Sequence, residues 1–181
     1  MGHEGHDHHS ADNPSASAKE HKAHAPVTVS AFVVTSSDSR DSAHDESGQL
    51  IRRALERSGH SVVGQQVVKD DPAALRQVLE QASGVGARAV IITGGTGIGR
   101  RDSTIEAVRP LLEKELPGFG ELFRALSFKE IGSAAMLSRA LAGSLKGMIV
   151  FALPGSPQAV RLAMEALILP ELGHLVRELT R

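Results

Sequence analysis

The sequence predicts an α/β fold: a three-layer α/β/α sandwich on a mostly parallel, doubly wound sheet. Three observations support this prediction. Apolar, β-branched runs alternate with segments of helical periodicity, polar loops separate them, and a glycine-rich loop follows the most apolar run. Because crossovers between parallel strands are right-handed, helices are expected on both faces of the sheet. A chain of 181 residues is long enough for one domain with a sizeable core.

The first half of the chain supplies strands and helices in alternation. Residues 27–35, VTVSAFVVT, are nearly all apolar, as expected of a strand that is buried on both faces. Residues 46–58 place their apolar side chains on one helical face. The strand expected over 60–68 alternates more, which favours a position nearer a sheet edge. Asp71 and Pro72 then predict the N-cap and first residue of the next helix.

The second half begins with the most hydrophobic strand, predicted over 88–93. The elements expected after it are a helix over 103–116, a short or broken helical stretch from 117, a helix over 133–145, a strand over 148–153 and a helix through much of 157–179. Met136, Leu137 and Leu141 are expected to face the core from the helix over 133–145. The sequence thus predicts four main strands.

Polar segments follow all four predicted strands. They are SSDSR at 36–40, KDD at 69–71, GGTGIGRRD at 94–102 and PGSP at 154–157. In open α/β sheets, ligands bind outside the carboxyl ends of the strands. We therefore expect these four segments to meet along one edge and to form a binding site, with Ser36 among the residues that contact the ligand.

The glycine-rich loop matches neither of the two common phosphate-binding patterns. The dinucleotide fingerprint fails because Arg100 stands where its third glycine is needed, and the P-loop pattern fails because arginines replace its lysine and hydroxyl. Closely spaced glycines still expose backbone N–H groups that bind anions. Arg101 could neutralise phosphate charge, and Asp102 could hold a metal ion. The plainer alternative is a tight turn in which Asp102 or Ser103 caps the next helix.

Three ordered motifs resemble one family. TGGTGIGRRDST, PGFGELFRALSFKEIGSAAMLSRALAG and VFALPGSP are similar to successive motifs of the molybdopterin-binding MoaB and MogA proteins, over roughly residues 27–175. The resemblance is to the MoaB type in particular. It implies a part in molybdenum cofactor biosynthesis: binding of molybdopterin and its adenylylation with Mg-ATP, which releases pyrophosphate. A non-catalytic molybdopterin-binding protein of the same pathway stays open as an alternative.

The resemblance also implies roles for individual residues. Asp70 and Asp102 are the acidic positions, expected to act in catalysis and to hold Mg²⁺ through the nucleotide; Asp70 is preferred to Asp71 because Asp71 is the natural helix cap. The other residues expected to contact the ligand are Thr93, Gly94, Gly95, Thr96, Gly97, Ser138, Arg139, Pro154, Gly155 and Ser156, together with Ser36 and Arg101. A phosphate monoester is mostly ionised near neutral pH, so the attacking group needs no protein nucleophile. Such transfer depends chiefly on positioning and charge neutralisation.

The expected domain spans residues 26–181. A His-rich leader over residues 1–25 precedes it. The leader holds almost nothing to bury and is expected to be disordered. Its histidines, of which His3, His6, His8 and His9 stand first, could bind metal weakly, but their spacing is not that of a defined site. A metal-handling accessory protein that acts through this leader is a third possibility.

Composition excludes several other functions. A net charge of −1 and an aromatic content of 3% argue against nucleic acid as a partner. No apolar run is long enough to cross a membrane, and the N-terminus lacks an apolar signal core, which predicts a cytoplasmic protein. The absence of cysteine excludes thiol catalysis. The resemblance suggests a homotrimer or homohexamer, with other molybdenum cofactor pathway enzymes as further partners.

Overall fold

The computed structural model describes residues 28–38 and 44–181. The predicted disorder of residues 1–25 and weak metal binding at His3, His6, His8 and His9 lie outside the described residues. No helix within 28–38 and 44–181 is long and apolar enough to span a membrane.

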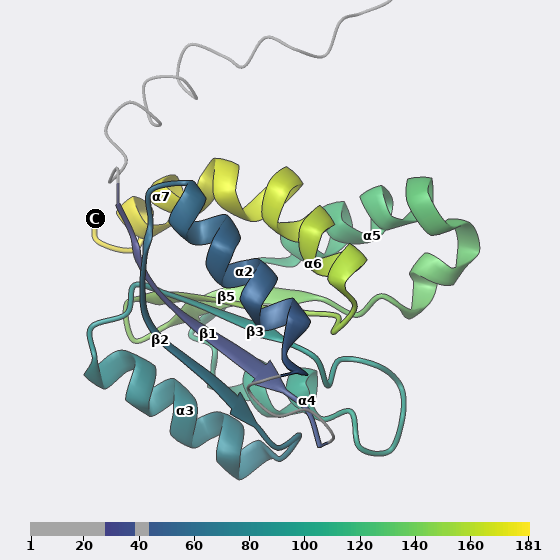
Figure 1. Cartoon of the computed structure of the whole chain (residues 1–181), viewed down its shortest axis with the longest axis horizontal. Helices are drawn as coiled ribbons and strands as arrows, with labels where there is room; N and C mark the ends of the chain where they lie inside the picture. Colours follow the sequence, from purple (N-terminus) through teal and green to yellow (C-terminus); the bar gives the residue numbers. More distant parts are fainter. Residues whose placement is uncertain (1–27, 39–43) are drawn as a thin grey trace, which may run out of the picture.

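One six-stranded sheet runs through the centre of the molecule, in the order β2-β1-β3-β6-β5-β4 (Figure 1). Its strands are β1 (Ser30–Ser36), β2 (Ser61–Val68), β3 (Ala89–Thr93), β4 (Lys114–Glu115), β5 (Leu141–Leu145) and β6 (Met148–Leu153). Strands β2, β1, β3 and β6 are parallel, whereas β5 and β4 are antiparallel to their neighbours. The α/β fold with a mostly parallel sheet is therefore confirmed, as is the edge position of β2.

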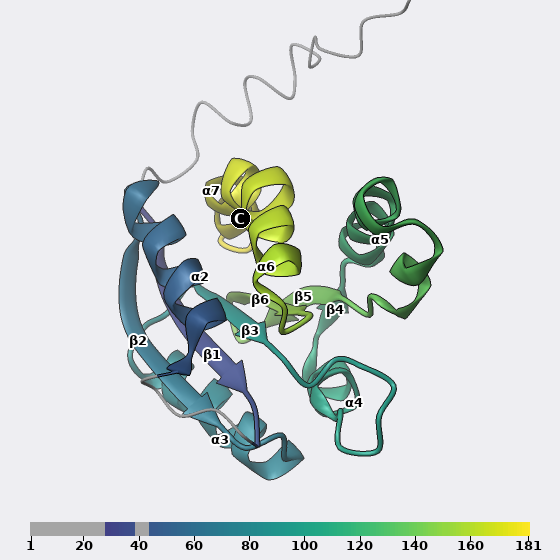
Figure 2. The same cartoon turned by 45° about the vertical axis from the view of Figure 1, so that its right-hand side comes forward.

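Helices cover both faces of the sheet and enclose two apolar cores (Figure 2). One face carries α2 (Glu46–Arg57), α5 (Pro117–Ile131), α6 (Pro157–Ala163), the π-helical turn η4 (Met164–Ile168) and α7 (Leu169–Glu178). The other carries α3 (Pro72–Gly84), α4 (Thr104–Val108) and the 3-10 turn η2 (Arg109–Leu111). Alternate residues of each central strand enter opposite cores, as Val33 and Val34 of β1 do. The three-layer arrangement matches the sequence-based expectation.

Side-chain caps fix the starts of the two helices that follow β1 and β2. Asp71 accepts a hydrogen bond from the Ala74 amide at 2.8 Å, and Pro72 is the first residue of α3, as predicted. The buried Asp45 caps α2 through the Gly48 amide at 2.9 Å and also accepts from the Thr35 hydroxyl at 2.9 Å. Both caps lie near the carboxyl ends of strands, so they also anchor the chain where the site was expected.

The predicted helix over 133–145 is wrong. After the 3-10 turn η3 (Gly132–Leu137), residues Leu141–Leu145 form β5, which pairs antiparallel with β6. Every β5 residue is buried, so both faces of the segment pack against protein, and a small-residue sequence that also suits a helix becomes a strand. On its other side β5 pairs with β4, and glycine is needed at position 143 because a Cβ there would overlap the Lys114 carbonyl oxygen of β4.

Two further expectations for this half of the chain are corrected. The helix predicted over 103–116 ends at Val108, because Pro110 follows and the chain turns through η2 into β4. The stretch from 117, expected to be short or broken, is the continuous helix α5 of 15 residues. Met136 and Leu137, expected in the core, are 76% and 54% exposed, and only Leu141 is buried.

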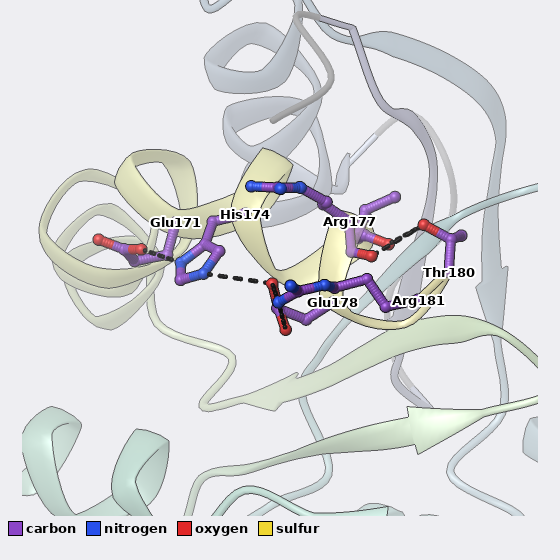
Figure 3. A network of polar contacts seen from close by, with 7 residues as sticks. Glu171, His174, Arg177, Glu178, Thr180 and Arg181 are labelled. Carbon is purple, nitrogen blue, oxygen red and sulfur yellow. Dashed lines mark hydrogen bonds and ion pairs between the residues drawn. The ribbon is translucent and has the colours of Figure 1, made fainter. Parts of the chain in front are cut away.

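Polar contacts hold the last turns of α7 at the far end of the molecule (Figure 3). His174 lies between Glu171, at 3.2 Å, and Glu178, at 3.9 Å. The Thr180 hydroxyl donates to the Arg177 carbonyl oxygen at 2.8 Å, and Arg181 pairs with Glu178 at 3.2 Å. Of these residues, Arg177 and Thr180 line a pocket with Ser30 of β1, so this part of the network lies at the amino end of β1.

Candidate ligand-binding pocket

The polar segments that follow the parallel strands meet along one edge of the sheet, as predicted. The Ser37 amide after β1 donates to the Val68 carbonyl oxygen of β2 at 2.9 Å, and the Gly94 amide after β3 donates to Leu153 of β6 at 3.0 Å. The Asp70 amide donates to the Asp38 carboxylate at 3.3 Å. These cross-links hold the loops after β1, β2, β3 and β6 together.

A pocket of about 420 Å³ opens between these loops and η3. Most residues that line it were predicted to contact a ligand: Ser36, Gly94, Gly95, Thr96, Gly97, Asp102, Ser138, Pro154 and Gly155. Ser37 and Leu137 also line it, although they were not among the candidates. A larger groove, of about 670 Å³, runs along α2 and α6 and contains none of the predicted site residues. The smaller pocket is therefore the candidate site.

Positive backbone angles shape the glycine-rich loop at its first two residues. Gly94 has a φ of +95° and Gly95 a φ of +61°, conformations that side chains disfavour. A Cβ at Gly94 would overlap the Ser36 carbonyl oxygen, and one at Gly95 would overlap the Asp70 carboxylate. Gly155 is packed tightly but less closely, since its Cβ would lie 3.2 Å from the Gly94 Cα. Glycine thus allows three strand ends to meet with no side chain between them.

Backbone N–H groups of this loop are available to a ligand. Within residues 28–38 and 44–181, the amides of Gly95, Thr96 and Gly97 donate to no protein group, whereas those of Gly94 and Gly99 do. All three residues with available amides line the pocket. Ser36, which is 3% exposed, has a hydroxyl without a hydrogen-bond partner in the described part of the chain. Unpartnered donors beside a pocket suit an anionic, oxygen-rich ligand.

The two acidic residues flank the glycine-rich loop on different sides. Asp102 lines the pocket, and the Gly99 amide donates to its carboxylate at 2.8 Å. Asp70 does not line the pocket: it lies behind Gly95 and accepts hydrogen bonds from the Ser103 amide, at 3.2 Å, and hydroxyl, at 3.0 Å. Among the described residues, neither carboxylate has a Lys or Arg ion-pair partner. No cluster of three or more His, Cys, Asp or Glu suited to a metal occurs there either.

The side-chain helix cap that was the plainer alternative at this loop is absent. Ser103 stands at the N-cap position of α4 but makes no side-chain capping bond; its hydroxyl binds Asp70 instead. Asp102 accepts from Gly99 within its own loop and not from α4. The plain alternative, in which Asp102 or Ser103 only caps the helix, therefore does not describe this loop.

Four predicted ligand contacts lie outside the pocket lining. The Thr93 hydroxyl is buried beneath the loop and donates to the Pro154 carbonyl oxygen at 3.1 Å. Arg101 is 85% exposed and reaches only the Asp38 carboxylate, at 3.7 Å. Ser156 caps α6 by accepting from the Ala159 amide at 3.2 Å. These three residues shape the loops or lie beside them and do not line the pocket.

Arg139, the fourth such residue, is held by Glu106 of α4. Its guanidinium donates to the two Glu106 carboxylate oxygens at 2.6 and 3.0 Å and to the Thr96 carbonyl oxygen at 2.7 Å. The hydrogen bond from Arg139 lowers the pKa of Glu106, and Glu106 in turn raises the pKa of Arg139. No sequence motif singled out Glu106, because its ion pair joins segments 33 residues apart.

Comparison with known proteins shows which family the chain resembles in sequence and in fold. Residues 28–174 match the family described as "Probable molybdopterin binding domain". The molybdenum cofactor biosynthesis protein B of Halalkalibacterium halodurans is 50% identical over 167 residues, 91% of this chain and 98% of that protein. A crystal structure of a molybdenum cofactor biosynthesis protein B superimposes with a TM-score of 0.84 at 50% identity, covering 87% of this chain and 99% of that one. The tungsten cofactor synthesizing protein MoaB from Pyrococcus furiosus gives a TM-score of 0.80 at 41% identity, covering 87% and 100%.

The fold is thus that of the molybdenum cofactor biosynthesis proteins. The chain belongs to the molybdopterin-binding domain family, and its relatives include molybdenum cofactor biosynthesis proteins B. The family resemblance seen in the sequence motifs is confirmed.

Proposed function

We propose that this chain binds molybdopterin in the pocket and adenylylates it with Mg-ATP during molybdenum cofactor biosynthesis. Two observations support this proposal: the available amides belong to Gly95, Thr96 and Gly97, which line the pocket, and the chain matches a family described as a probable molybdopterin binding domain. A terminal phosphate bound there would meet amide donors on one side and the Ser138 side of the pocket on the other.

In the proposed reaction, a phosphate oxygen of molybdopterin attacks the α-phosphorus of ATP. A new P–O bond forms, the bond to the β-phosphate oxygen breaks, and pyrophosphate leaves with that electron pair. The products are adenylyl-molybdopterin and pyrophosphate. Because the attacking phosphate is already ionised near neutral pH, the protein's part is to orient the two phosphates and to balance their charge.

Asp102, which lines the pocket, fits a magnesium ion that arrives with the nucleotide, and Asp70 is the second carboxylate of this proposal. Mg²⁺ is commonly held by one or two carboxylates plus substrate phosphates. Neither carboxylate forms an ion pair with a Lys or Arg among the described residues, although the charges of Asp102 and Arg139 attract each other. When bound, Mg²⁺ would neutralise phosphate charge. Asp102, which faces the pocket, is the more direct candidate ligand, whereas Asp70 also orders Ser103 and the loop.

One observation favours the non-catalytic alternative. Asp70 is separated from the pocket by Gly95 and is already hydrogen-bonded to Ser103, so a second carboxylate is not exposed at the site. A protein that only binds molybdopterin would need the amide row but not this carboxylate. The third possibility, a metal-handling role for the His-rich leader, concerns residues outside the described part of the chain.

Adenylyl transfer from Mg-ATP to molybdopterin, followed under anaerobic conditions, separates these functions. Asp102→Asn keeps the shape of the side chain and removes its charge, so we expect molybdopterin binding to persist and AMP transfer to fall by about 100-fold or more. Asp71→Asn is the matched control, because Asn also caps helices and the charge that it removes lies one residue from Asp70. Wild-type protein that binds molybdopterin but transfers no AMP would refute catalysis and leave the binding function.

Two further expectations remain predictions. The resemblance suggests a homotrimer or homohexamer, which light scattering of the purified chain would measure. Other molybdenum cofactor pathway enzymes, as suppliers or acceptors of the pterin, are the protein partners that this proposal implies.

A further inference from the structure

The Arg139 guanidinium joins three segments that surround the pocket. It extends from a position two residues before β5, binds Glu106 on α4 and binds the Thr96 carbonyl oxygen in the glycine-rich loop. Its neighbour Ser138 lines the pocket, as does Thr96. One side chain therefore fixes the distance between two walls of the same pocket.

The contact to Thr96 acts on the last amide of the row, that of Gly97. Thr96 is 3% exposed, and its carbonyl oxygen is held at 2.7 Å from the Arg139 Nε. A peptide plane that is fixed at its oxygen is also fixed at the amide that it carries, because the peptide unit is planar. The amide in that plane belongs to Gly97, one of the three available donors. Arg139 thus sets the direction in which this donor points.

Glu106 holds the guanidinium in the orientation that reaches Thr96. Both carboxylate oxygens accept from Arg139, at 2.6 and 3.0 Å, in a bidentate arrangement that fixes the guanidinium plane as well as its position. The Arg139 side chain is 30% exposed and that of Glu106 57%, so the pair contributes little to overall stability. The main consequence of the pair is therefore the fixed orientation of the Arg139 guanidinium.

We propose that Glu106 is a positioning residue for the pocket: it holds Arg139 against Thr96 and thereby orients the Gly97 amide toward the bound phosphate. This inference rests on the proposed function. Arg139, which the resemblance places among the ligand contacts, acts in this arrangement through the loop and does not touch the ligand.

The two roles for Arg139 predict opposite effects of Glu106→Gln on molybdopterin binding. If Arg139 contacts the phosphate directly, loss of the Glu106 charge frees the guanidinium and removes a nearby anion, so affinity should rise. If Glu106 positions Arg139, affinity should fall by about two- to fivefold, the factor expected for an exposed charge-assisted pair. The sign of the change therefore discriminates between the roles.

The test measures molybdopterin dissociation constants under anaerobic conditions for Glu106→Gln, Arg139→Gln and the double variant. We expect the double variant to bind no more weakly than Arg139→Gln, because both changes remove the same contact to Thr96. Arg139→Lys should fall between wild type and Arg139→Gln, since one ammonium group cannot span Glu106 and Thr96 as the guanidinium does. Additive losses, or equal or tighter binding by Glu106→Gln, would overturn the proposal.

The control is Glu80→Gln, which breaks the Glu80–Lys146 pair, an exposed pair at 2.7 Å with no residue in the pocket. It should shift the melting temperature as much as Glu106→Gln does while leaving the dissociation constant unchanged.

Hydrogen exchange of the ligand-free proteins tests the inference separately from the proposed function. Glu106→Gln should speed exchange in peptides that cover 94–102 and leave those of α3 unchanged, and Glu80→Gln should leave 94–102 unchanged. If wild-type protein fails to bind molybdopterin, the proposed function fails while exchange still decides the positioning role. Unchanged exchange in 94–102 would overturn it.

Discussion

Replacing Gly94 by alanine tests whether close packing of the strand ends creates the pocket. Gly94 has a φ of +95°, and a Cβ there would lie closer than 3.0 Å to the Ser36 carbonyl oxygen, which belongs to backbone and cannot rotate away. Gly59 provides the matched control, since its φ is +81° but nothing lies within 4 Å of its added Cβ. Comparison of the two variants separates backbone strain from steric overlap.

The magnitudes follow from those two terms. Positive φ costs an L-residue about 1–2 kcal/mol, which both variants incur. The overlap with Ser36 adds about 1–3 kcal/mol, typical of an extra methyl group forced into a packed site. Reduced entropy of the unfolded chain applies equally to both variants and cancels in the comparison. We therefore expect Gly59→Ala to lose about 1–2 kcal/mol of unfolding free energy and Gly94→Ala about 2–5 kcal/mol.

Urea unfolding, followed by circular dichroism, measures both free energies. Gly94→Ala should also lose molybdopterin binding, because relief of the overlap moves the loop away from β1, whereas Gly59→Ala should bind as wild type does. Equal destabilisation by the two variants, or an unchanged dissociation constant for Gly94→Ala, would refute the argument that contact between Gly94 and Ser36 sets the shape of the pocket.

Three further predictions concern caps and pH. Asp45→Ala should cost about 2–4 kcal/mol in urea unfolding, since it removes the α2 cap and leaves a buried Thr35 hydroxyl unpaired; a loss below 1 kcal/mol would contradict this role. Asp71→Ala should cost about 1 kcal/mol through the α3 cap without weakening molybdopterin binding. Burial lowers the pKa of His60 below 6.5, and its neutral Nδ1 accepts from the Val29 amide. The stability that neutral His60 contributes is present above pH 6.5 and is lost as the pH drops through the lowered pKa of the folded state. The melting temperature of His60→Gln should therefore decline less between pH 7.5 and 5.5 than that of wild type.

Local signals located most of the fold and most of the pocket. The strand over 148–153 was predicted with its observed bounds, and Asp71 with Pro72 correctly predicted the start of α3. These elements are readable because a run buried on both faces, or a cap followed by proline, has its cause in adjacent residues. The part of the pocket that the strand-end loops form was predictable, because parallel strands place the loops that follow them on one side of the sheet.

The segment over 133–145 shows where such signals fail. Its small and apolar residues satisfy a helix and a strand equally, and the choice is made by β4 and β6, which lie on either side of β5. The same rearrangement exposes Met136 and Leu137, and it brings Leu137 and Ser138 to the pocket. The sequence assigned Ser138 to the site only through the family resemblance.

By itself, the sequence determined the fold class, the family and the identity of the loop that carries the available amides. The periodicity, the glycine-rich loop and the ordered motifs that indicate them all involve residues that are close together in the sequence. The tertiary structure alone decided that Asp102 faces the pocket while Asp70 lies behind Gly95, and that Glu106 holds Arg139 against Thr96. Side-chain direction across segments 33 residues apart is set by packing, and no local pattern encodes it.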